Sequence, residues 1–426
     1  MPNLLRTTLP LGVAAGCAAA MLVPGSAPAR STARPATADE EVQNLRAQGP
    51  AGLQILLARY ERTPAGPERD ELARRIDKVA AQRYATESRL YWYTDLEQAE
   101  IAAHATHKPI LALRMLGALD DELSCANSRL FRSTLYANAN VSKFLREHFV
   151  LYWSTERPVP KVTIDMGDGR QIVRTVTGNS AHYVLAEDGS VLDVLPGMYT
   201  PQIFEAELGK SLVLAKRVQA VAPAQRTAAV IAFHRDGFAK RHATFKSVAG
   251  SLYSPTSRTL PTLLGRAQRA TVSKAVMEMP ILAKIGIDAG SIPRDDFAQW
   301  AAVGKYMWKV TLPPDLGEVQ PLAFLDEPSR ALVARLHTGG AKDREADLGL
   351  VMGQLEQHML ADSAQNELQL RQQIRQHIVD SGDLRFTSLN DWVYANVFHT
   401  PKQDTWLGLV TPGEFTGLPR DGIVLP

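Results

Sequence analysis

The pattern that most constrains the fold is an alternation of strand and helix signals between residues 90 and 218. Short apolar and aromatic runs alternate with helical stretches, two runs flank the turn Gly167-Asp168-Gly169, and two more flank the turn Glu187-Asp188-Gly189. The predicted strands are 90–93, 109–115, 149–153, 161–166, 171–176, 182–186 and 191–195, and the predicted helices are 95–106, 125–136, 140–148 and 201–218. Thr94 and Glu97 form a capping-box pattern at the start of the first helix. This order predicts an α/β fold with a mixed sheet and helices on both faces.

The chain of 426 residues is too long for one ordinary domain, and its pattern changes along its length. The sequence predicts five parts: a signal peptide at 1–29, a disordered lead-in at 30–39, a helical N-terminal appendage at 40–88, the alternating unit at 89–218 and a helical C-terminal domain at 219–426. Within the C-terminal domain, apolar residues at helical spacing predict helices at 223–249, 262–285, 294–308, 328–337 and 343–381. The appendage is expected to hold two helices, at 40–60 and 67–88.

The N-terminus has the features of an export signal. Arg6 precedes an apolar run from Leu9 to Val23, and Ala27-Pro28-Ala29 matches the small-x-small cleavage pattern. The run is shorter than the roughly 20 residues that a membrane-spanning helix needs, and no later segment has that length and apolar content. We therefore expect an exported protein, periplasmic or secreted, without an integral membrane segment after signal removal. Processing as a lipoprotein at Cys17 is a weaker alternative.

Charge excludes one class of partner. The sequence has 47 basic and 45 acidic residues, for a net charge of +2, and contains no basic run. Proteins that bind nucleic acid through the phosphate backbone carry a marked excess of positive charge. We therefore expect no nucleic-acid partner. The sequence also shows no pattern that calls for a cofactor.

Removal of the signal peptide leaves one cysteine, Cys125, because Cys17 lies within the signal. No disulfide can then form within the mature chain, although an exported protein meets an oxidising compartment. A single thiol in such a protein is either a buried core residue or a reactive group.

The surroundings of Cys125 resemble a known family. The segment "HKPILALRM…SCANSRLFRSTLYANANVSKFLREHFVLYW" and the closing "TGNSAHYVLAEDGSVLDVLPGMYTPQIFEAEL" are similar to exported thioredoxin-like proteins, in which a strand that begins Lys-Pro leads to a Cys-x-x-Cys helix. The similarity covers about 130 residues, less than a third of the chain. It implies a thioredoxin-like mixed sheet with flanking helices, and it places Cys125-Ala126-Asn127-Ser128 at the active-site position as Cys-x-x-Ser.

Two residues depart from the family pattern. Ser128 stands where the resolving cysteine would be, so disulfide cycling within this chain is impossible. Ser180 stands where the family has a cis-proline that faces the cysteine pair, and a cis bond before a residue other than proline is costly. The geometry of the substrate side is therefore in doubt.

The resemblance implies a monothiol chemistry with Cys125 and Ser128 as the catalytic residues. A thiol at the first turn of a helix faces unpaired amides that stabilise the thiolate, and Arg129 and Arg132 would add positive charge. Asp120, Asp121 and Glu122 would oppose this effect, while the Ser128 hydroxyl could donate to the sulfur. Such a thiol can form a mixed disulfide but needs a thiol from outside to release it.

Two functions stay open from the sequence. The first is thiol–disulfide exchange through Cys125, with an unknown protein or a small thiol as partner. The second is a non-enzymatic thioredoxin-fold module that binds a partner or scaffolds a complex, with an inert cysteine.

Other polar groups carry weaker signals. His104 and His107 are three residues apart near the end of a predicted helix, but no third ligand at metal-binding spacing accompanies them, so we expect surface histidines and no metal site. The face of 354–377 that carries Glu367 and Arg371 is expected to be solvated, with ion pairs between residues four apart.

Overall fold

The computed structural model describes residues 37–175, 178–252, 294–311, 324–339, 342–406 and 418–423. The predicted signal peptide, most of the predicted lead-in and the predicted helix at 262–285 lie outside the described residues. Within the described parts, the structure confirms an α/β fold with a mixed sheet and a long helical C-terminal region. None of the described helices combines the length and apolar content that a bilayer crossing needs.

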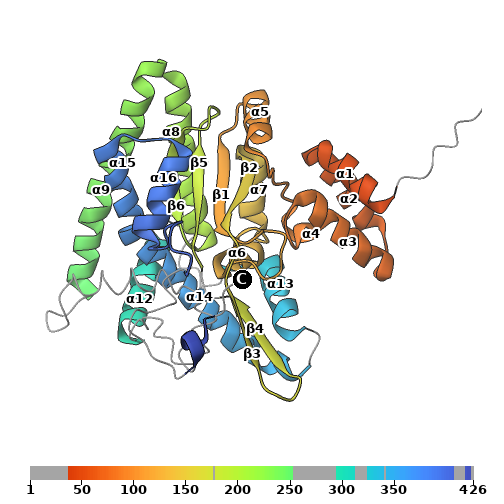
Figure 1. Cartoon of the computed structure of the whole chain (residues 1–426). Helices are drawn as coiled ribbons and strands as arrows, with labels where there is room; N and C mark the ends of the chain where they lie inside the picture. Colours follow the sequence, from red (N-terminus) through yellow and green to blue (C-terminus); the bar gives the residue numbers. More distant parts are fainter. Residues whose placement is uncertain are drawn as a thin grey trace, which may run out of the picture.

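The N-terminal helices form a group of their own to one side of the sheet (Figure 1). They are α1 (Ala38–Ala47), α2 (Pro50–Arg62), α3 (Pro67–Ala80) and α4 (Ala85–Ser88). The predicted helix 40–60 is therefore two helices. Gly49 has a positive φ of 64°, and Pro50 then begins a new helix because its ring cannot continue the preceding one.

The middle of the chain supplies the sheet. Its elements are α5 (Leu96–Thr106), β1 (Ile110–Leu116), α6 (Ala126–Leu130), the π-helical turn η1 (Phe131–Leu135), α7 (Ala139–His148), β2 (Val150–Arg157), β3 (Lys161–Asp165), β4 (Gln171–Thr175), β5 (Ser180–Leu185), β6 (Val191–Pro196) and α8 (Pro201–Ala220). Two local predictions fail. The predicted strand 90–93 forms only a bridge between Tyr93 and Tyr152. Helix α5 is capped by Asp95, because the Thr94 hydroxyl instead accepts a 2.9 Å hydrogen bond from Arg46.

The four-stranded sheet has the order β2-β1-β5-β6. Strand β1 pairs in parallel with β2 and antiparallel with β5, and β5 pairs antiparallel with β6. Strands β3 and β4 pair only with each other, as a hairpin that projects away from the sheet (Figure 1). The hairpin lies between β2 and β5 along the chain but outside the four-stranded sheet. After it, β5 returns to the centre of that sheet and pairs with β1.

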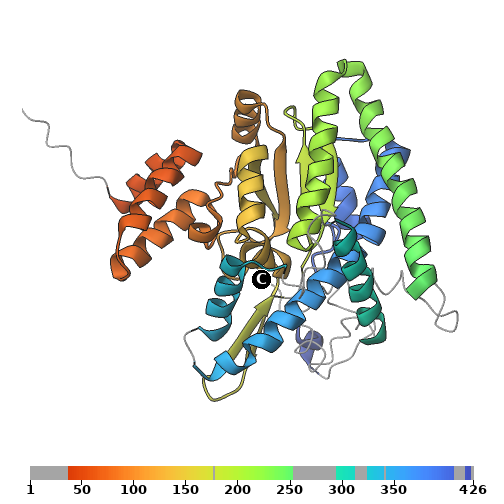
Figure 2. The same ribbon diagram turned by 180° about the vertical axis from the view of Figure 1, so that it is seen from behind.

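Helices cover both faces of the sheet, as the sequence predicts. Helices α7 and α8 lie across one face, which Figure 2 shows from behind. Successive residues of a strand point to opposite faces. Accordingly, His182 packs against Phe204 of α8, whereas Tyr183 packs against Phe386 of α16 on the other face.

The described elements of the C-terminal region are all helices or helical turns. These are α9 (Pro223–Leu252), α12 (Arg294–Thr311), α13 (Glu327–Thr338), the 3-10 helix η3 (Lys342–Asp347), α14 (Leu348–Gln365), the π-helical turn η4 (Asn366–Leu370), α15 (Arg371–Ser381), α16 (Phe386–Trp392), the π-helical turn η5 (Val393–Val397) and the 3-10 helix η6 (Pro419–Gly422). Helices α15 and α16 lie beside β6 (Figure 1).

The hydrophobic core crosses the predicted boundary at residue 218. One continuous cluster of buried residues joins the sheet to the C-terminal helices, from Leu111 and Val194 to Leu360 and Tyr394. The N-terminal helices have a separate small cluster around Leu56 and Ile76. The C-terminal helices therefore share their core with the sheet, whereas the N-terminal group is attached from outside.

A buried network of charges lies where the C-terminal helices meet the sheet. The Arg371 guanidinium on α15 is fully buried and donates to Asp193 of β6 at 2.5 Å, to Glu207 of α8 at 2.7 Å and to Glu367 at 2.7 Å. Burial raises the pKa of Asp193, but the charge of Arg371, the charges of His234 and Arg375 and the hydrogen bond from Ser211 together outweigh it, so the pKa is lowered. The network thus joins the sheet, α8 and α15 through ionised groups.

The expectation of a solvated face at 354–377 is wrong at its centre. The pair between Glu367 and Arg371 forms, but both side chains are fully buried. The reason lies outside the helix, because Asp193 and Glu207 supply the partners that make burial of the arginine tolerable.

We expect Arg371→Met to lower the free energy of unfolding by about 3–5 kcal/mol, because it removes the buried cation that Asp193, Glu207 and Glu367 share. Urea denaturation followed by circular dichroism measures the change. The control is Arg170→Ala, which removes an exposed ion pair with Asp168 on the β3–β4 hairpin and should cost less than about 1 kcal/mol. An equally small cost for both variants would contradict the structural role of the network.

A partly buried acid, Asp77, lies near the end of α3, close to α4. Asp77 accepts a 2.8 Å hydrogen bond from the amide of Ala85, yet burial raises its pKa from 3.8 to about 6. The folded state therefore holds this proton to higher pH than the unfolded state does. Stability from this group is fully present below pH 3.8 and is lost as the pH rises to about 6.

We expect Asp77→Asn to stabilise the protein at pH 7 by up to about 3 kcal/mol, the free energy that corresponds to this pKa change. Below pH 4 the variant and the parent should be equally stable. Thermal unfolding recorded from pH 4 to pH 7.5 tests this, and a variant that loses stability in parallel with the parent over that range would contradict it.

Candidate functional site

Cys125 caps the start of α6, at the end of the loop that follows β1. Its amide donates a 3.2 Å hydrogen bond to the carbonyl of Leu116, which ties the residue to the end of the strand. Its side chain is a free thiol with 0% exposure. The structure therefore places the predicted nucleophile in the core.

Two buried tyrosines share the hydrophobic core with Cys125. Burial raises the pKa of both Tyr136 and Tyr394, and the nearby Cys125 thiol contributes in the same direction. Tyr136 follows η1, whereas Tyr394 comes from η5 in the C-terminal region. The Tyr394 hydroxyl also donates to the carbonyl of Asn179 at 3.4 Å. Residues more than 250 positions apart thus belong to the same core as the thiol.

The Ser128 hydroxyl has hydrogen-bond partners other than the Cys125 sulfur. Its hydroxyl lies 2.7 Å from the Ser124 hydroxyl and 2.8 Å from the Cys125 carbonyl oxygen. Both contacts stay within the first turn of the helix. The pairing of Ser128 with the thiol, expected from the sequence, is therefore replaced by contacts that hold the turn itself.

The two arginines that were expected beside the thiol have other partners. Arg132 is buried and donates to the carbonyls of Leu119 at 2.9 Å and Asp121 at 2.6 Å, so it holds the loop before Cys125. Burial lowers the pKa of Arg132. Arg129 donates to the Thr175 hydroxyl at 3.0 Å, at the end of the β3–β4 hairpin.

The acidic loop also turns outward. Glu122 contacts the Arg83 guanidinium at 2.9 Å and accepts a hydrogen bond from the Tyr84 hydroxyl. Arg129, Arg132 and Glu122, which the sequence suggested would act on the thiol, thus have partners elsewhere in the folded chain.

Ser180 begins β5 opposite Met115 and is fully buried. Its carbonyl accepts a 2.8 Å hydrogen bond from the amide of Gly197, while its hydroxyl has no partner among the described residues. None of the described peptide bonds is cis, so the chain passes this point in the ordinary trans form.

A buried histidine, which the sequence pattern did not single out, lies near the thiol. His182 on β5 is 2.7 Å from the Tyr136 hydroxyl through Nε2, and its ring packs on Phe131 with centroids 4.7 Å apart. Burial lowers the pKa of His182 to about 3, so the ring is neutral near pH 7. The available signal was an ionisable side chain within a strand whose residues are all buried.

The end of the sheet is covered by the segment that follows η5. The Asn179 amide donates to the Thr400 hydroxyl at 3.1 Å. Arg157 at the end of β2 donates to the carbonyls of Asp404 at 2.6 Å and Pro401 at 3.1 Å. The C-terminal region is therefore tied to the end of β2 and to the residue before β5.

The two predicted surface histidines meet a common carboxylate. His104 and His107 lie 3.4 Å and 3.6 Å from Glu187 through Nδ1, and both side chains are exposed. Among the described residues, no three acidic, histidine or cysteine side chains are arranged to hold a metal ion.

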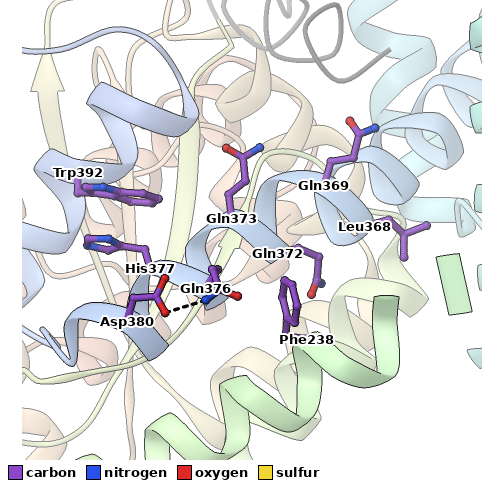
Figure 3. A pocket seen from close by; sticks show the side chains of 9 residues that line it. All are labelled: Phe238, Leu368, Gln369, Gln372, Gln373, Gln376, His377, Asp380 and Trp392. Carbon is purple, nitrogen blue, oxygen red and sulfur yellow. Dashed lines mark hydrogen bonds between the residues drawn. The ribbon is translucent and has the colours of Figure 1, made fainter. Parts of the chain in front are cut away.

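A separate hollow opens on the C-terminal helices, between α9 and α15. It has a volume of about 490 Å³ and is lined by four glutamines of η4 and α15, with aromatic rings at its walls (Figure 3). Trp392 stacks on His377 at one end, with ring centroids 3.8 Å apart and planes inclined by 6°. No pattern in the sequence predicted this groove, because its walls come from helices far apart along the chain.

Comparison with models of known protein families, with curated protein sequences and with solved structures finds no match.

We expect Tyr136→Phe to lower the free energy of unfolding by about 1–3 kcal/mol. The change removes the hydroxyl that satisfies His182 Nε2, and His182 Nδ1 has no partner among the described residues. Urea denaturation measures the cost, with Tyr306→Phe as the control because the Tyr306 side chain is 48% exposed. A change of less than about 0.5 kcal/mol for Tyr136→Phe would contradict a buried hydrogen bond here.

Proposed function

We propose that this chain is an exported thioredoxin-like binding or scaffold module in which Cys125 is a structural core residue. One observation carries the proposal: the thiol is fully buried, in the same hydrophobic core as Tyr136 and as Tyr394 of the C-terminal region. A module of this kind acts through its surface.

The thioredoxin-like part of the proposal draws on both sequence and topology. The resemblance around Lys108–Trp153 agrees with a sheet in which β1 and β2 are parallel, β5 is antiparallel to β1, and β6 pairs antiparallel with β5 at the edge. The lone cysteine sits between β1 and the following helix, as that resemblance implies. The β3–β4 hairpin is then an insertion. Export rests on the signal-like pattern of residues 1–29.

The chemistry of the site disfavours thiol–disulfide exchange. Exchange requires a thiolate that reaches a disulfide sulfur, and apolar burial disfavours the charged form. Ser128 cannot resolve a mixed disulfide, and its hydroxyl contacts Ser124 and a carbonyl oxygen. Arg132, which could have favoured a thiolate, is committed to the preceding loop. Thiol–disulfide exchange through Cys125 and an outside thiol is therefore the alternative function, and the alkylation experiment below tests it.

We expect Cys125 in the native protein to react with iodoacetamide at pH 7.5 on the order of a hundredfold more slowly than glutathione, because reaction needs local opening. Full reactivity should return in denaturing urea. Mass spectrometry of quenched samples gives the rate for the mature chain, in which Cys125 is the single thiol.

Tyr394→Ala supplies the positive control, because it removes a large side chain from the core that holds the thiol while leaving the cysteine in place. Its thiol should react faster than the parent's under the same native conditions. A parent thiol that reacts as fast as glutathione without denaturant would overturn the inert-cysteine proposal and favour monothiol exchange.

A further inference from the structure

The groove between α9 and α15 has features that a packed surface lacks. Its volume of about 490 Å³ is within the range of small-molecule sites. It lies on the side of α15 away from the sheet, and its polar lining comes mainly from one helix (Figure 3). Its lining includes none of Cys125, Tyr136 and Tyr394.

The helix that lines the groove is held rigidly from behind. Arg371, Ile374 and Ile378 on its inner side are buried, and Arg371 is fixed by the charge network. The π-helical turn η4 immediately precedes α15 and includes Gln369. Such turns shift the helical register and occur often at functional sites. The outer side chains are thus presented on a fixed support, which lowers the entropy cost of binding.

Two glutamines of the groove have side-chain oxygens without partners among the described residues, and two donate their amide groups to other residues. Gln369 is 7% exposed, and its Oε1 has no partner among the described residues. Gln372 donates its amide to the Glu367 carbonyl at 2.8 Å, while its Oε1 is likewise unpaired within the described chain. Gln376 donates to Asp380 at 2.7 Å. Buried acceptors without partners are costly, so this lining calls for a ligand that brings N–H or O–H donors.

The charge and the aromatic walls of the groove limit the class of ligand further. Asp380 is an exposed carboxylate at the rim, and none of the described residues that line the groove is lysine or arginine. Burial lowers the pKa of His377, so its ring and the stacked Trp392 form a neutral aromatic wall near pH 7. Phe238 lies on the opposite wall (Figure 3). Aromatic faces, a carboxylate and amide oxygens together favour an ammonium group.

The nearest buried cation does not change this balance. Arg375 of α15 packs against α9, where its guanidinium is over the Phe233 ring, and it lies 3.8 Å from Glu367. Its charge is therefore offset within the network behind the helix.

We propose that this groove is a binding site for a small aliphatic diamine or polyamine. One ammonium group would contact Asp380 and the aromatic wall, and the methylene chain would lie along the glutamines toward Gln369. The proposal rests on the proposed function, since it supplies the ligand class of a binding module. No bond is made or broken in this binding.

Three probes of equal chain length test the charge requirement: cadaverine, pentanediol and glutarate. Isothermal titration calorimetry of the full mature chain at pH 7.5 and low salt should show saturable binding of cadaverine. Pentanediol should bind about tenfold more weakly, the factor expected for losing charge-assisted hydrogen bonds, and glutarate should not bind.

The matched variants are Asp380→Asn and Asp165→Asn. The first removes the carboxylate at the rim of the groove and should weaken cadaverine binding about tenfold. The second makes the same change on the distant β3–β4 hairpin and should leave binding unchanged. Equal thermal unfolding of both variants and the parent shows that they are folded.

Three results would overturn the proposal: no cadaverine binding to the folded parent, pentanediol binding as tight as cadaverine, or equal weakening by both variants. The outcome is separable from the thiol test. A reactive Cys125 with normal cadaverine binding would remove the inert-cysteine proposal alone, whereas a slow thiol without cadaverine binding would remove the groove proposal alone.

Discussion

The burial of Arg371 among three carboxylates is the interaction on which the rest of the structure depends. An unpaired guanidinium in a core is strongly destabilising, and so is an unpaired carboxylate. Each group is therefore tolerable only when the sheet, α8 and α15 are docked together. Apolar packing supplies most of the association free energy, since the buried cluster is continuous across these elements. The charges fix the register in which that packing occurs.

One docking event then has two consequences at opposite sides of α15. Toward the sheet, the C-terminal chain places Tyr394 in the core that holds Cys125, and Tyr394 and Thr400 both bond to Asn179. Away from the sheet, α15 holds its glutamines against α9 and leaves a groove between them. The burial of the thiol and the formation of the groove therefore follow from the same arrangement of helices.

The sequence predicted the local elements well where periodicity decides them. Strands β1, β5 and β6 and the β3–β4 hairpin lie within a few residues of their expected positions, because their alternation and turn residues are local signals. The aromatic run 90–93 failed as a strand because only Tyr93 reaches a partner strand. The cap of α5 moved to Asp95 because Arg46, about fifty residues away, occupies the Thr94 hydroxyl.

The site was predictable only in part, because its character is set by distant contacts. The position of Cys125 before a short helix was visible in the sequence. The core that buries it includes Tyr394, and the pairing of Tyr136 with His182 joins a helix to a strand 46 positions away. Likewise, Glu367 and Arg371 have the spacing of a surface ion pair, and only Asp193 and Glu207 turn that pair into part of the core.

The most direct test of the account is native-state hydrogen exchange of the full chain in low concentrations of denaturant. Amides of β1, β5, α14 and α15 should open with one common free energy, because the sheet and the C-terminal helices form one cooperative unit. The N-terminal helices, with their separate cluster, should open at a lower free energy. Opening of α14 and α15 well below β1 and β5 would show that the helices detach from the sheet, and a closed Cys125 would no longer be a property of the folded protein.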